Sequence, residues 1–338
     1  MPPRAVPPRA VPARAVPARA VPPPGVPPRP DALPAPVDVE GLRRRLDEAG
    51  YLADAGLSTA MALAVALGLP ILLEGEPGVG KTEAAKALAR ARGSSLIRLQ
   101  CYEGLAASEA LYEWNYQRQL LAIRAAESRH ERLADDDLFT EEFLQERPIL
   151  RAVRAATPVP PVLLIDEIDR ADDEFEALLL EFLGEASVTV PEIGTFHATR
   201  RPAVVLTSNR SRELHDALRR RCLYHWISFP DPERVAAILR RRVPQAGEAV
   251  VASVSAFVGR VRGLDLEKAP GMAEAIDWLS ALSALGVAAL APAEPGWPDL
   301  GLTLGALAKT PDDLDSVRDA LAEPLGGGCG PAADAPRR

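Results

Sequence analysis

Short apolar runs bounded by polar or turn-forming residues recur through the central part of the chain. Such runs are typical of strands that are buried on both faces of a parallel sheet. Between the first two runs, the stretch Glu83–Ala91 is rich in alanine and leucine, which predicts a helix. The predicted strands are Pro70–Glu74, Ser95–Gln100, Val162–Ile165 and Val204–Ser208.

The clearest helical period follows the third of these strands. Apolar residues stand there at i, i+3, i+4, i+7 and i+8, so they form one face of a helix, and Asp172 or Asp173 can cap its first turn. Beyond this helix, Val188–Val190 and Thr195–Ala198 are predicted to pair as a hairpin through the turn Pro191–Gly194. The apolar face consists of Phe175, Leu178, Leu179, Phe182 and Leu183.

Helical patterns flank this alternating region. Val39 to about Leu67 is predicted to be helical, and the longer, more polar stretch from Tyr102 to about Ala156 is expected to contain helices. A boundary is predicted at Pro230–Pro232, after which Val235–Leu321 is mainly helical. The order of these elements predicts an α/β fold with a three-layer core, followed by a small helical domain.

The first 36 residues differ in composition from the rest of the chain. A five-residue unit, AVPPR or AVPAR, repeats from Ala5 to Val21, and 14 of the 33 prolines precede Val37. Proline at this density removes amide donors and fixes φ, which predicts an extended segment without a packed core. We interpret residues 1–36 as an unstructured tail, with a tail that docks on a partner or an anionic surface as the alternative.

The net charge of −8 is unevenly distributed along the chain. Five arginines lie within the first thirty residues, where no acid occurs. Without them, 34 Lys and Arg stand against 47 Asp and Glu, which leaves the remainder with a net charge of −13. Such an acidic body is a poor default surface for nucleic acid, so a nucleic-acid partner is not expected. The five are Arg4, Arg9, Arg14, Arg19 and Arg29.

Composition also argues against several other classes of protein. No apolar run approaches the ~18 residues that cross a bilayer, and the N-terminus lacks the apolar core of a secretory signal. We therefore expect a cytoplasmic protein without a membrane span. The cysteines form no CxxC pair and the histidines show no ligand spacing, so neither a disulfide framework nor a zinc site is expected. These residues are Cys101, Cys222, Cys329, His130, His197, His215 and His225.

The segment from Gly75 to Thr82 reads GEPGVGKT and matches the pattern GxxxxGK[ST]. In this pattern, backbone amides without side-chain obstruction wrap phosphate groups at the N-terminus of a helix. Lys81 is expected to neutralise the β- and γ-phosphates of ATP, and Thr82 is expected to place its hydroxyl on Mg²⁺. The predicted nucleotide-binding residues are Gly75, Glu76, Pro77, Gly78, Val79, Gly80, Lys81, Thr82 and Glu83.

Two carboxylates follow the predicted strand Val162–Ile165. A phosphate-binding loop needs a metal-side carboxylate from a neighbouring strand, so Asp166 is predicted to hold Mg²⁺ together with Thr82. Glu167 is predicted to orient and polarise the water that attacks the γ-phosphate. The presence of Glu167 favours hydrolysis over binding alone.

Asn209 ends the strand Val204–Ser208, so its amide is expected to reach the γ-phosphate and the attacking water, with a turn residue as the alternative. An arginine cluster follows in the segment Ala217–Arg221. A guanidinium from this cluster could offset charge on a phosphate bound by a neighbouring subunit. A basic run is also typical of a solvated face, so both interpretations stay open.

These four elements, in this order, resemble an AAA+ ATPase. The segments ILLEGEPGVGKT, LLIDEIDRAD, VVLTSNR and HDALRRRCLYHWISFPDPER resemble the MoxR branch. They are most similar to its members found beside genes for carbon monoxide dehydrogenase and related molybdenum hydroxylases. The resemblance covers about Val37 to Leu325. It implies a P-loop NTPase core with sheet order 5-1-4-3-2 at residues 37–229, a helical lid domain at 230–325 and a second tail at 326–338.

The resemblance also implies a ring-forming remodelling ATPase, usually hexameric, that matures a metalloenzyme with a von Willebrand factor A-domain partner. By this resemblance Lys81 and Thr82 match the Walker A pair. Asp166 and Glu167 match the Walker B pair, and Asn209 matches sensor 1. The sequence therefore predicts an ATP-hydrolysing chaperone. The alternatives are a nucleotide-gated regulatory or scaffolding module with low turnover and a DNA-associated AAA+ ATPase.

Other positions take their expected roles from the resemblance alone. Arg221 is the preferred arginine finger, and Arg220 is the second candidate. Many relatives carry a sensor 2 arginine in the lid, whereas the comparable stretch here is Lys268–Met272. Either Lys268 substitutes for that arginine or the γ-phosphate lacks this contact.

Three aromatic residues lie where the family carries an insertion within its second helix. At alternate positions they are expected to pack against neighbours, with stacking on a client or a base as the alternative. They are Tyr112, Trp114 and Tyr116. The hairpin predicted at Val188–Ala198 resembles the pre-sensor 1 hairpin, which faces the pore of the ring.

Overall fold

The structure is a computed structural model that describes residues 36–130, 133–290 and 300–322. Residues 1–35 of the predicted N-terminal tail, and the whole predicted tail 326–338, lie outside the described residues. Within the described residues, no helix is both long enough and apolar enough to cross a membrane.

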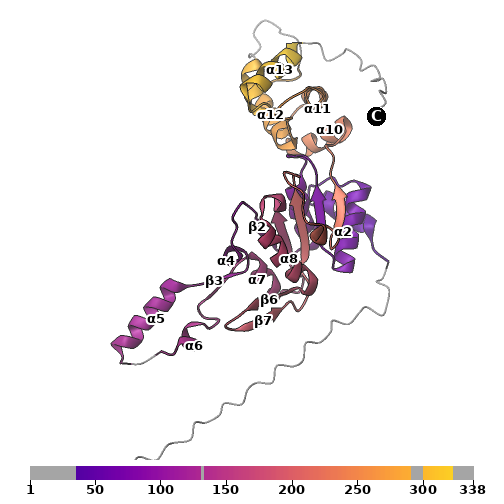
Figure 1. Ribbon diagram of the computed structural model, residues 1–338. Helices are drawn as coiled ribbons and strands as arrows, with labels where there is room; N and C mark the ends of the chain where they lie inside the picture. Colours follow the sequence, from indigo (N-terminus) through magenta and orange to yellow (C-terminus); the bar gives the residue numbers. More distant parts are fainter. Residues whose placement is uncertain (1–35, 131–132, 291–299, 323–338) are drawn as a thin grey trace, which may run out of the picture. The chain divides into compact units, whose positions relative to one another are not determined.

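A five-stranded parallel sheet forms the centre of the α/β region (Figure 1). Its strands lie in the order β2-β5-β8-β1-β9, which is 5-1-4-3-2 when they are numbered along the chain, so the predicted topology is confirmed. β1 lies between β8 and β9, and Ile71 is paired with both Val205 and Leu223. The strands are β1 (Ile71–Glu74), β2 (Leu96–Gln100), β5 (Val162–Asp166), β8 (Ala203–Ser208) and β9 (Leu223–Trp226).

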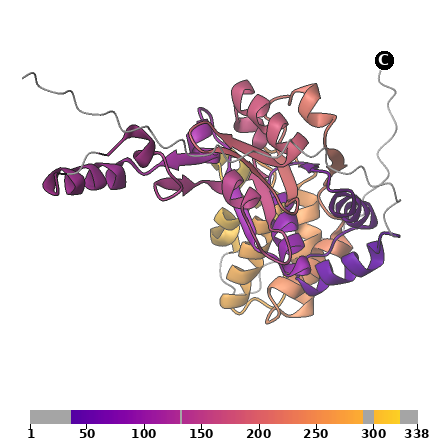
Figure 2. The same ribbon diagram turned by 90° about the horizontal axis from the view of Figure 1, so that it is seen from below.

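Helices cover both faces of the sheet, which gives the three predicted layers (Figure 2). Alternate strand residues point to opposite faces. Ile71 and Leu73 pack in one apolar cluster with α1, α2 and α3, whereas Leu72 and Leu163 pack in another with α7 and α8. The helices around the sheet are α1 (Val39–Glu48), α2 (Ala55–Leu67), α3 (Lys81–Arg92), α7 (Pro148–Val153), α8 (Asp173–Glu185) and α9 (Asp216–Arg219).

The prediction of one helical segment from Val39 to Leu67 is wrong at its centre, because the chain forms two helices there. Gly50 has a φ of +84°. The Asp54 carboxylate accepts a hydrogen bond from the amide of Leu57 and so caps α2. A left-handed glycine stops one helix, and a capping aspartate begins the next.

The predictions after β5 are confirmed with small shifts in bounds. Asp172 caps α8, since its carboxylate accepts a hydrogen bond from the Phe175 amide at 2.8 Å. The predicted hairpin consists of β6 (Ser187–Val190) and β7 (Gly194–His197), which pair antiparallel. A 3₁₀ turn, η1 (Ile168–Arg170), joins β5 to α8.

The segment between β2 and α7 contains the expected helices and a two-stranded antiparallel sheet that the sequence did not predict. The Trp114 ring lies edge-on to Phe139, with 5.1 Å between ring centroids, so the expected packing of Trp114 is confirmed. By contrast, Tyr116 is 66% exposed. The elements are α4 (Ala107–Ala110), β3 (Tyr112–Trp114), α5 (Tyr116–Ser128), α6 (Asp135–Leu138) and β4 (Leu144–Glu146).

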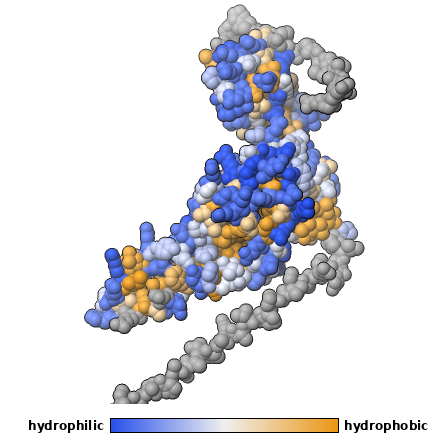
Figure 3. All heavy atoms as spheres, in the orientation of Figure 1, coloured by the Kyte–Doolittle hydropathy of each residue, from blue (hydrophilic) through white to orange (hydrophobic). Residues whose placement is uncertain are grey.

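Helix α5 exposes large apolar side chains, and Figure 3 shows orange surface over this helix. They are Tyr116, Leu120 and Leu121.

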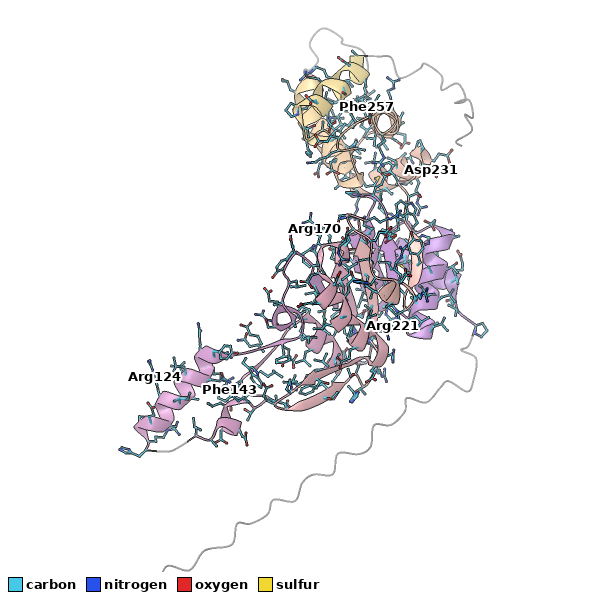
Figure 4. All side chains as sticks on the ribbon, in the orientation of Figure 1. Arg124, Phe143, Arg170, Arg221, Asp231 and Phe257 are labelled. Atoms are coloured by element: carbon cyan, nitrogen blue, oxygen red, sulfur yellow. The ribbon has the colours of Figure 1, made fainter. Side chains whose placement is uncertain are left out.

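The predicted helical lid domain has an apolar cluster of its own. At its centre Trp278 packs against Phe257, which Figure 4 labels, with 5.2 Å between ring centroids. The Trp278 indole N–H donates to the hydroxyl of Thr303 at 2.8 Å. The elements are α10 (Pro232–Arg242), α11 (Glu248–Val261), α12 (Met272–Ala284), η2 (Leu300–Ala306) and α13 (Pro311–Ala322).

Candidate nucleotide-binding site

The loop Gly75–Thr82 joins β1 to α3 and has a backbone that requires glycine. Gly78 and Gly80 have φ values of +78° and +98°, which residues with a Cβ rarely adopt. A Cβ on Gly75 would lie 2.3 Å from the Ile227 carbonyl oxygen. The sequence therefore folds into a bare backbone turn that leads into the N-terminus of α3, where amides can face an anion.

Lys81 is buried beside this loop, with 7% of its surface exposed. Its ammonium donates to the carbonyl oxygens of Gly75 at 2.6 Å and Glu76 at 2.8 Å. Burial lowers the pKa of Lys81, and the nearby carboxylates, led by Asp169, oppose that shift. A cation is therefore held next to the turn that the sequence predicts to bind phosphate.

Asp166 lies at the end of β5 and collects hydrogen bonds from three other elements. The Thr82 hydroxyl donates to its carboxylate at 3.0 Å, as the prediction of a shared metal site requires. The Thr207 hydroxyl of β8 donates to the same carboxylate at 2.5 Å, and the Arg98 guanidinium of β2 donates at 2.6 Å. These donors fix the carboxylate next to the loop. They also satisfy its oxygens, which is needed because Asp166 is only 2% exposed.

The sequence analysis missed Arg98 and Thr207. The available signal was the presence of polar residues among the apolar ones in two strands, LIRLQ and AVVLTS. Both strands are hydrogen-bonded to β5 in the sheet. A buried carboxylate needs donors around it. The buried Thr207 hydroxyl and the half-exposed Arg98 side chain, which lies in the middle of β2, both donate to Asp166.

Glu167 occupies the left-handed region, with a φ of +56°. Its amide donates to the Thr207 hydroxyl at 2.9 Å. Its carboxylate lies 3.0 Å from the Nε atom of Arg170, which Figure 4 labels. Non-glycine residues in this conformation are uncommon and cluster at functional sites, and Glu167 lines the cavity described below.

Asn209 follows β8 and lines the same cavity. Its backbone N–H donates to the Asp169 carboxylate at 3.2 Å. The amide and hydroxyl of Ser211 donate to the same oxygen at 2.8 and 2.7 Å. Asp169, which is 3% exposed, therefore ties the loop after β8 to the loop after β5. The sequence analysis did not single out this carboxylate.

Arg220 and Arg221 lie away from this carboxyl edge. Both precede β9, whose first residue Leu223 is paired with the first residue of β1. The Arg221 guanidinium donates to the Leu180 carbonyl at 2.7 Å, and Arg220 lies 3.7 Å from the Asp216 carboxylate. Figure 4 labels Arg221 on the core. The structure does not bring either arginine to the cavity of its own chain.

A cavity of about 420 Å³ opens beside the loop and is lined by both the α/β core and the lid. Its lining combines apolar residues with the polar side chains of Lys81, Asp166, Glu167 and Asn209. Sites for small ligands typically combine an apolar lining with a few convergent polar groups. Lining residues that the sequence analysis missed include Tyr51, Leu52, Arg234, Arg242, Met272 and Ile276.

Two other predicted positions have different surroundings. Glu83 lines the cavity, but its carboxylate lies 2.7 Å from Arg90 and 3.1 Å from Arg242. Lys268 is exposed, and its amide donates to the Asp313 carboxylate at 3.1 Å. Lys268 is not among the residues that line the cavity.

The residues present fit a triphosphate and a magnesium ion. Among the described residues, no group of three or more His, Cys, Asp or Glu side chains could hold a metal ion. Mg²⁺ commonly uses one or two protein ligands together with phosphate oxygens and water. A hydroxyl and a carboxylate 3.0 Å apart beside a glycine cradle provide that partial set.

Residues 70–222 match the family model of the AAA domain (dynein-related subfamily). The matched span contains the loop, Asp166, Glu167, Asn209 and the arginine cluster. An AAA domain therefore occupies this part of the chain, which has the P-loop NTPase fold. No curated protein matches the chain.

Several solved structures are similar to this chain. One variant of RuvB from Thermotoga maritima has 17% identity and a TM-score of 0.41, over 78% of this chain and 66% of that chain. A second variant of the same RuvB has 18% identity and a TM-score of 0.43, over 78% and 72%. A "putative ATPase" from Cytophaga hutchinsonii has 18% identity and a TM-score of 0.43, over 83% and 85%. The chain spans slightly less than two thirds of the first RuvB chain.

Proposed function

We propose that this chain, which carries an AAA domain at residues 70–222, binds ATP with Mg²⁺ and hydrolyses it. The catalytic core is residues 37–229, and the lid is residues 230–325. The observation that carries the proposal is the hydrogen bond between the Thr82 hydroxyl and the Asp166 carboxylate, which are 84 residues apart in the sequence. This contact joins the phosphate loop to the acid of a neighbouring strand.

Each side chain then has a defined task. The loop amides hold the phosphates, and Lys81 turns from the carbonyls of Gly75 and Glu76 to the phosphate oxygens. Thr82 and Asp166 hold Mg²⁺, which supplies positive charge to the β- and γ-phosphates. Oriented charges of this kind stabilise the charge that develops during transfer.

Glu167 accepts a proton from the water that attacks the γ-phosphorus, while the bond to the bridging oxygen of ADP breaks. Asn209 orients that water from the end of the neighbouring strand β8. Arg221 acts on ATP that a second copy of the chain holds, because it lies far from the cavity of its own chain. Hydrolysis at the full rate therefore requires an oligomer, which we propose to be a hexameric ring.

The work driven by hydrolysis is the remodelling of a protein client. This part of the proposal is supported by the resemblance of the loop, the acid pair and the arginine segment to the MoxR branch. A metalloenzyme client and a von Willebrand factor A-domain partner are proposed on the same ground.

Substitution of Glu167 by Gln tests the proposal. Loss of a general base slows a reaction by about 10² to 10⁴-fold, so phosphate release should fall at least about a hundredfold while ATP stays bound. Glu181→Gln changes an exposed acid on α8 and should release phosphate at the normal rate.

Normal phosphate release by the Glu167→Gln protein would show that the base is wrongly assigned. Wild-type protein that binds ATP but releases no phosphate, with or without a partner, would favour a nucleotide-gated module. Stimulation of phosphate release by DNA at physiological salt would favour a DNA-associated ATPase.

A further inference from the structure

The lid contacts the phosphate loop at three neighbouring points. The Met272 amide, at the start of α12, donates to the Gly78 carbonyl at 2.9 Å. The backbones of Gly271 and Gly78 approach so closely that a Cβ on Gly271 would lie 2.6 Å from the Gly78 Cα. In addition, the Arg262 guanidinium at the end of α11 donates to the Glu76 carboxylate.

Contacts other than the one with Glu76 also hold the Arg262 side chain in place. Its Nη1 atom donates to the Pro270 carbonyl at 2.7 Å, and its guanidinium lies 3.8 Å from the centroid of the Phe229 ring. The side chain is 13% exposed. A stacked, partly desolvated guanidinium loses little freedom when it pairs, so the contact is well defined although the Glu76 side chain is 57% exposed.

Glu76 links this lid arginine to Lys81. Its carboxylate pairs with Arg262, and its carbonyl accepts a hydrogen bond from the Lys81 ammonium at 2.8 Å. When Lys81 turns toward phosphate, the Glu76 carbonyl loses that donor, so the residue is held mainly by the lid. A change in the position of the Lys81 ammonium therefore alters the contacts of the loop with the end of α11 and the start of α12.

We propose that Arg262 is a positioning residue of the ATP site, which acts through Glu76 and couples the phosphate loop to the lid. This inference rests on the proposed ATP-binding function and adds a route by which nucleotide binding moves the lid. Arg262 pairs with a carboxylate of the loop, and Lys268 is exposed elsewhere in the lid. The pair thus supplies a lid contact where the segment Lys268–Met272 has no arginine.

Hydrogen exchange of the amides at Met272–Ile276 measures the docking of the lid directly, because the Met272 amide is bonded to the loop. The experiment compares the full-length chain with Arg262→Gln, Glu76→Gln and the double variant, each with and without ATP and Mg²⁺. The affinity for ATP, kcat and KM are measured on the same proteins. Arg318→Gln is the control, because Arg318 pairs with Asp315 on α13 and that pair is exposed.

The inference predicts that exchange at these amides is about tenfold faster in each single variant without nucleotide, as expected for a coupled pair. The double variant should match Arg262→Gln, since Glu76 is proposed to act on the lid through Arg262. ATP should change the exchange in the wild-type chain and in Arg318→Gln but not in Arg262→Gln. The kcat of Arg262→Gln should fall about tenfold while its affinity for ATP changes less than about threefold, and Arg262→Lys should recover part of kcat.

Two results would overturn the inference on its own. One is an ATP response in Arg262→Gln that equals that of the wild-type chain, and the other is exchange in the double variant that equals the sum of the two single effects. Failure of the wild-type chain to bind ATP would instead refute the proposed function, and with it the nucleotide response. In that case, unchanged exchange in nucleotide-free Arg262→Gln would also refute the lid contact itself.

Discussion

At the scale of single residues, Asp166 organises the site because one buried carboxylate receives donors from three elements. Thr82 comes from the phosphate loop, Thr207 from β8 and Arg98 from β2. A buried charge is costly unless such donors surround it. The sequence predicted Asp166 and Thr82 from a motif, but the contacts of Arg98 and Thr207 depend on the order of strands in the sheet.

Thr207→Val tests this arrangement at constant side-chain volume. The substitution removes the hydroxyl that donates to Asp166 and accepts from the Glu167 amide. A hydrogen bond to a charged group contributes about 1.5–3 kcal/mol, so kcat for ATP should fall about tenfold or more in a steady-state phosphate-release assay. Thr207→Ser keeps the hydroxyl and should stay close to the wild-type kcat. A valine variant with normal kcat would show that the hydroxyl has no part in positioning the two acids.

At the scale of elements, the structure places the lid directly on the phosphate loop. Gly271 lies before α12 with a φ of −89°, so its backbone does not require glycine. Position 271 requires glycine because Gly78 of the loop leaves no room for a side chain there. A Cβ at position 271 would lie 3.0 Å from the Gly78 carbonyl oxygen.

Gly271→Ala should therefore push the lid from the loop without straining the backbone at position 271. Overpacking of this kind costs about 1–3 kcal/mol, so ATP should bind about tenfold more weakly in an equilibrium titration. Gly247→Ala is a matched control, because Gly247 also precedes a lid helix, has a φ of −66° and has nothing within 4 Å of a Cβ. Equal affinities in the two alanine variants would contradict the contact between lid and loop.

The same scale shows which elements a sequence can predict. β5 was predicted because it is an apolar run, and all five of its residues are buried. α8 was predicted because its apolar residues form one regular face. β9 was supplied only by the resemblance, since it is a short strand at the edge of the sheet whose residues are half-buried or exposed. The ion pair between Arg262 and Glu76 joins positions 186 residues apart, so no local pattern could indicate it.

At the scale of the whole molecule, two groups of residues that the proposed reaction needs lie at opposite edges of the sheet in one chain. Glu167 and Asn209 follow strands at the carboxyl edge of the sheet, whereas Arg221 precedes β9 at the opposite edge. The proposed hydrolysis therefore predicts that a second copy brings its Arg221 to the ATP of the first.

Mixing two inactive variants tests this requirement. Lys81→Ala should weaken the binding of ATP by its own subunit but leave its Arg221 intact, while Arg221→Ala should leave ATP binding intact. A mixture of the two proteins should recover phosphate release above the sum of the separate activities, because some neighbours combine an intact loop with an intact arginine. No recovery, despite mixed oligomers shown by native mass spectrometry, would contradict the role of Arg221.

The central claim is that the loop Gly75–Thr82 and Asp166 hold ATP together with Mg²⁺. Calorimetric titration of ATP into the wild-type chain and the Lys81→Ala chain, with Mg²⁺ present, tests it most directly. The matched control is Lys309→Ala, because the Lys309 ammonium also donates to two backbone carbonyls but is exposed in the lid region. We predict that Lys81→Ala weakens binding by about tenfold or more while Lys309→Ala has no effect, whereas equal affinity in all three folded proteins would contradict the claim.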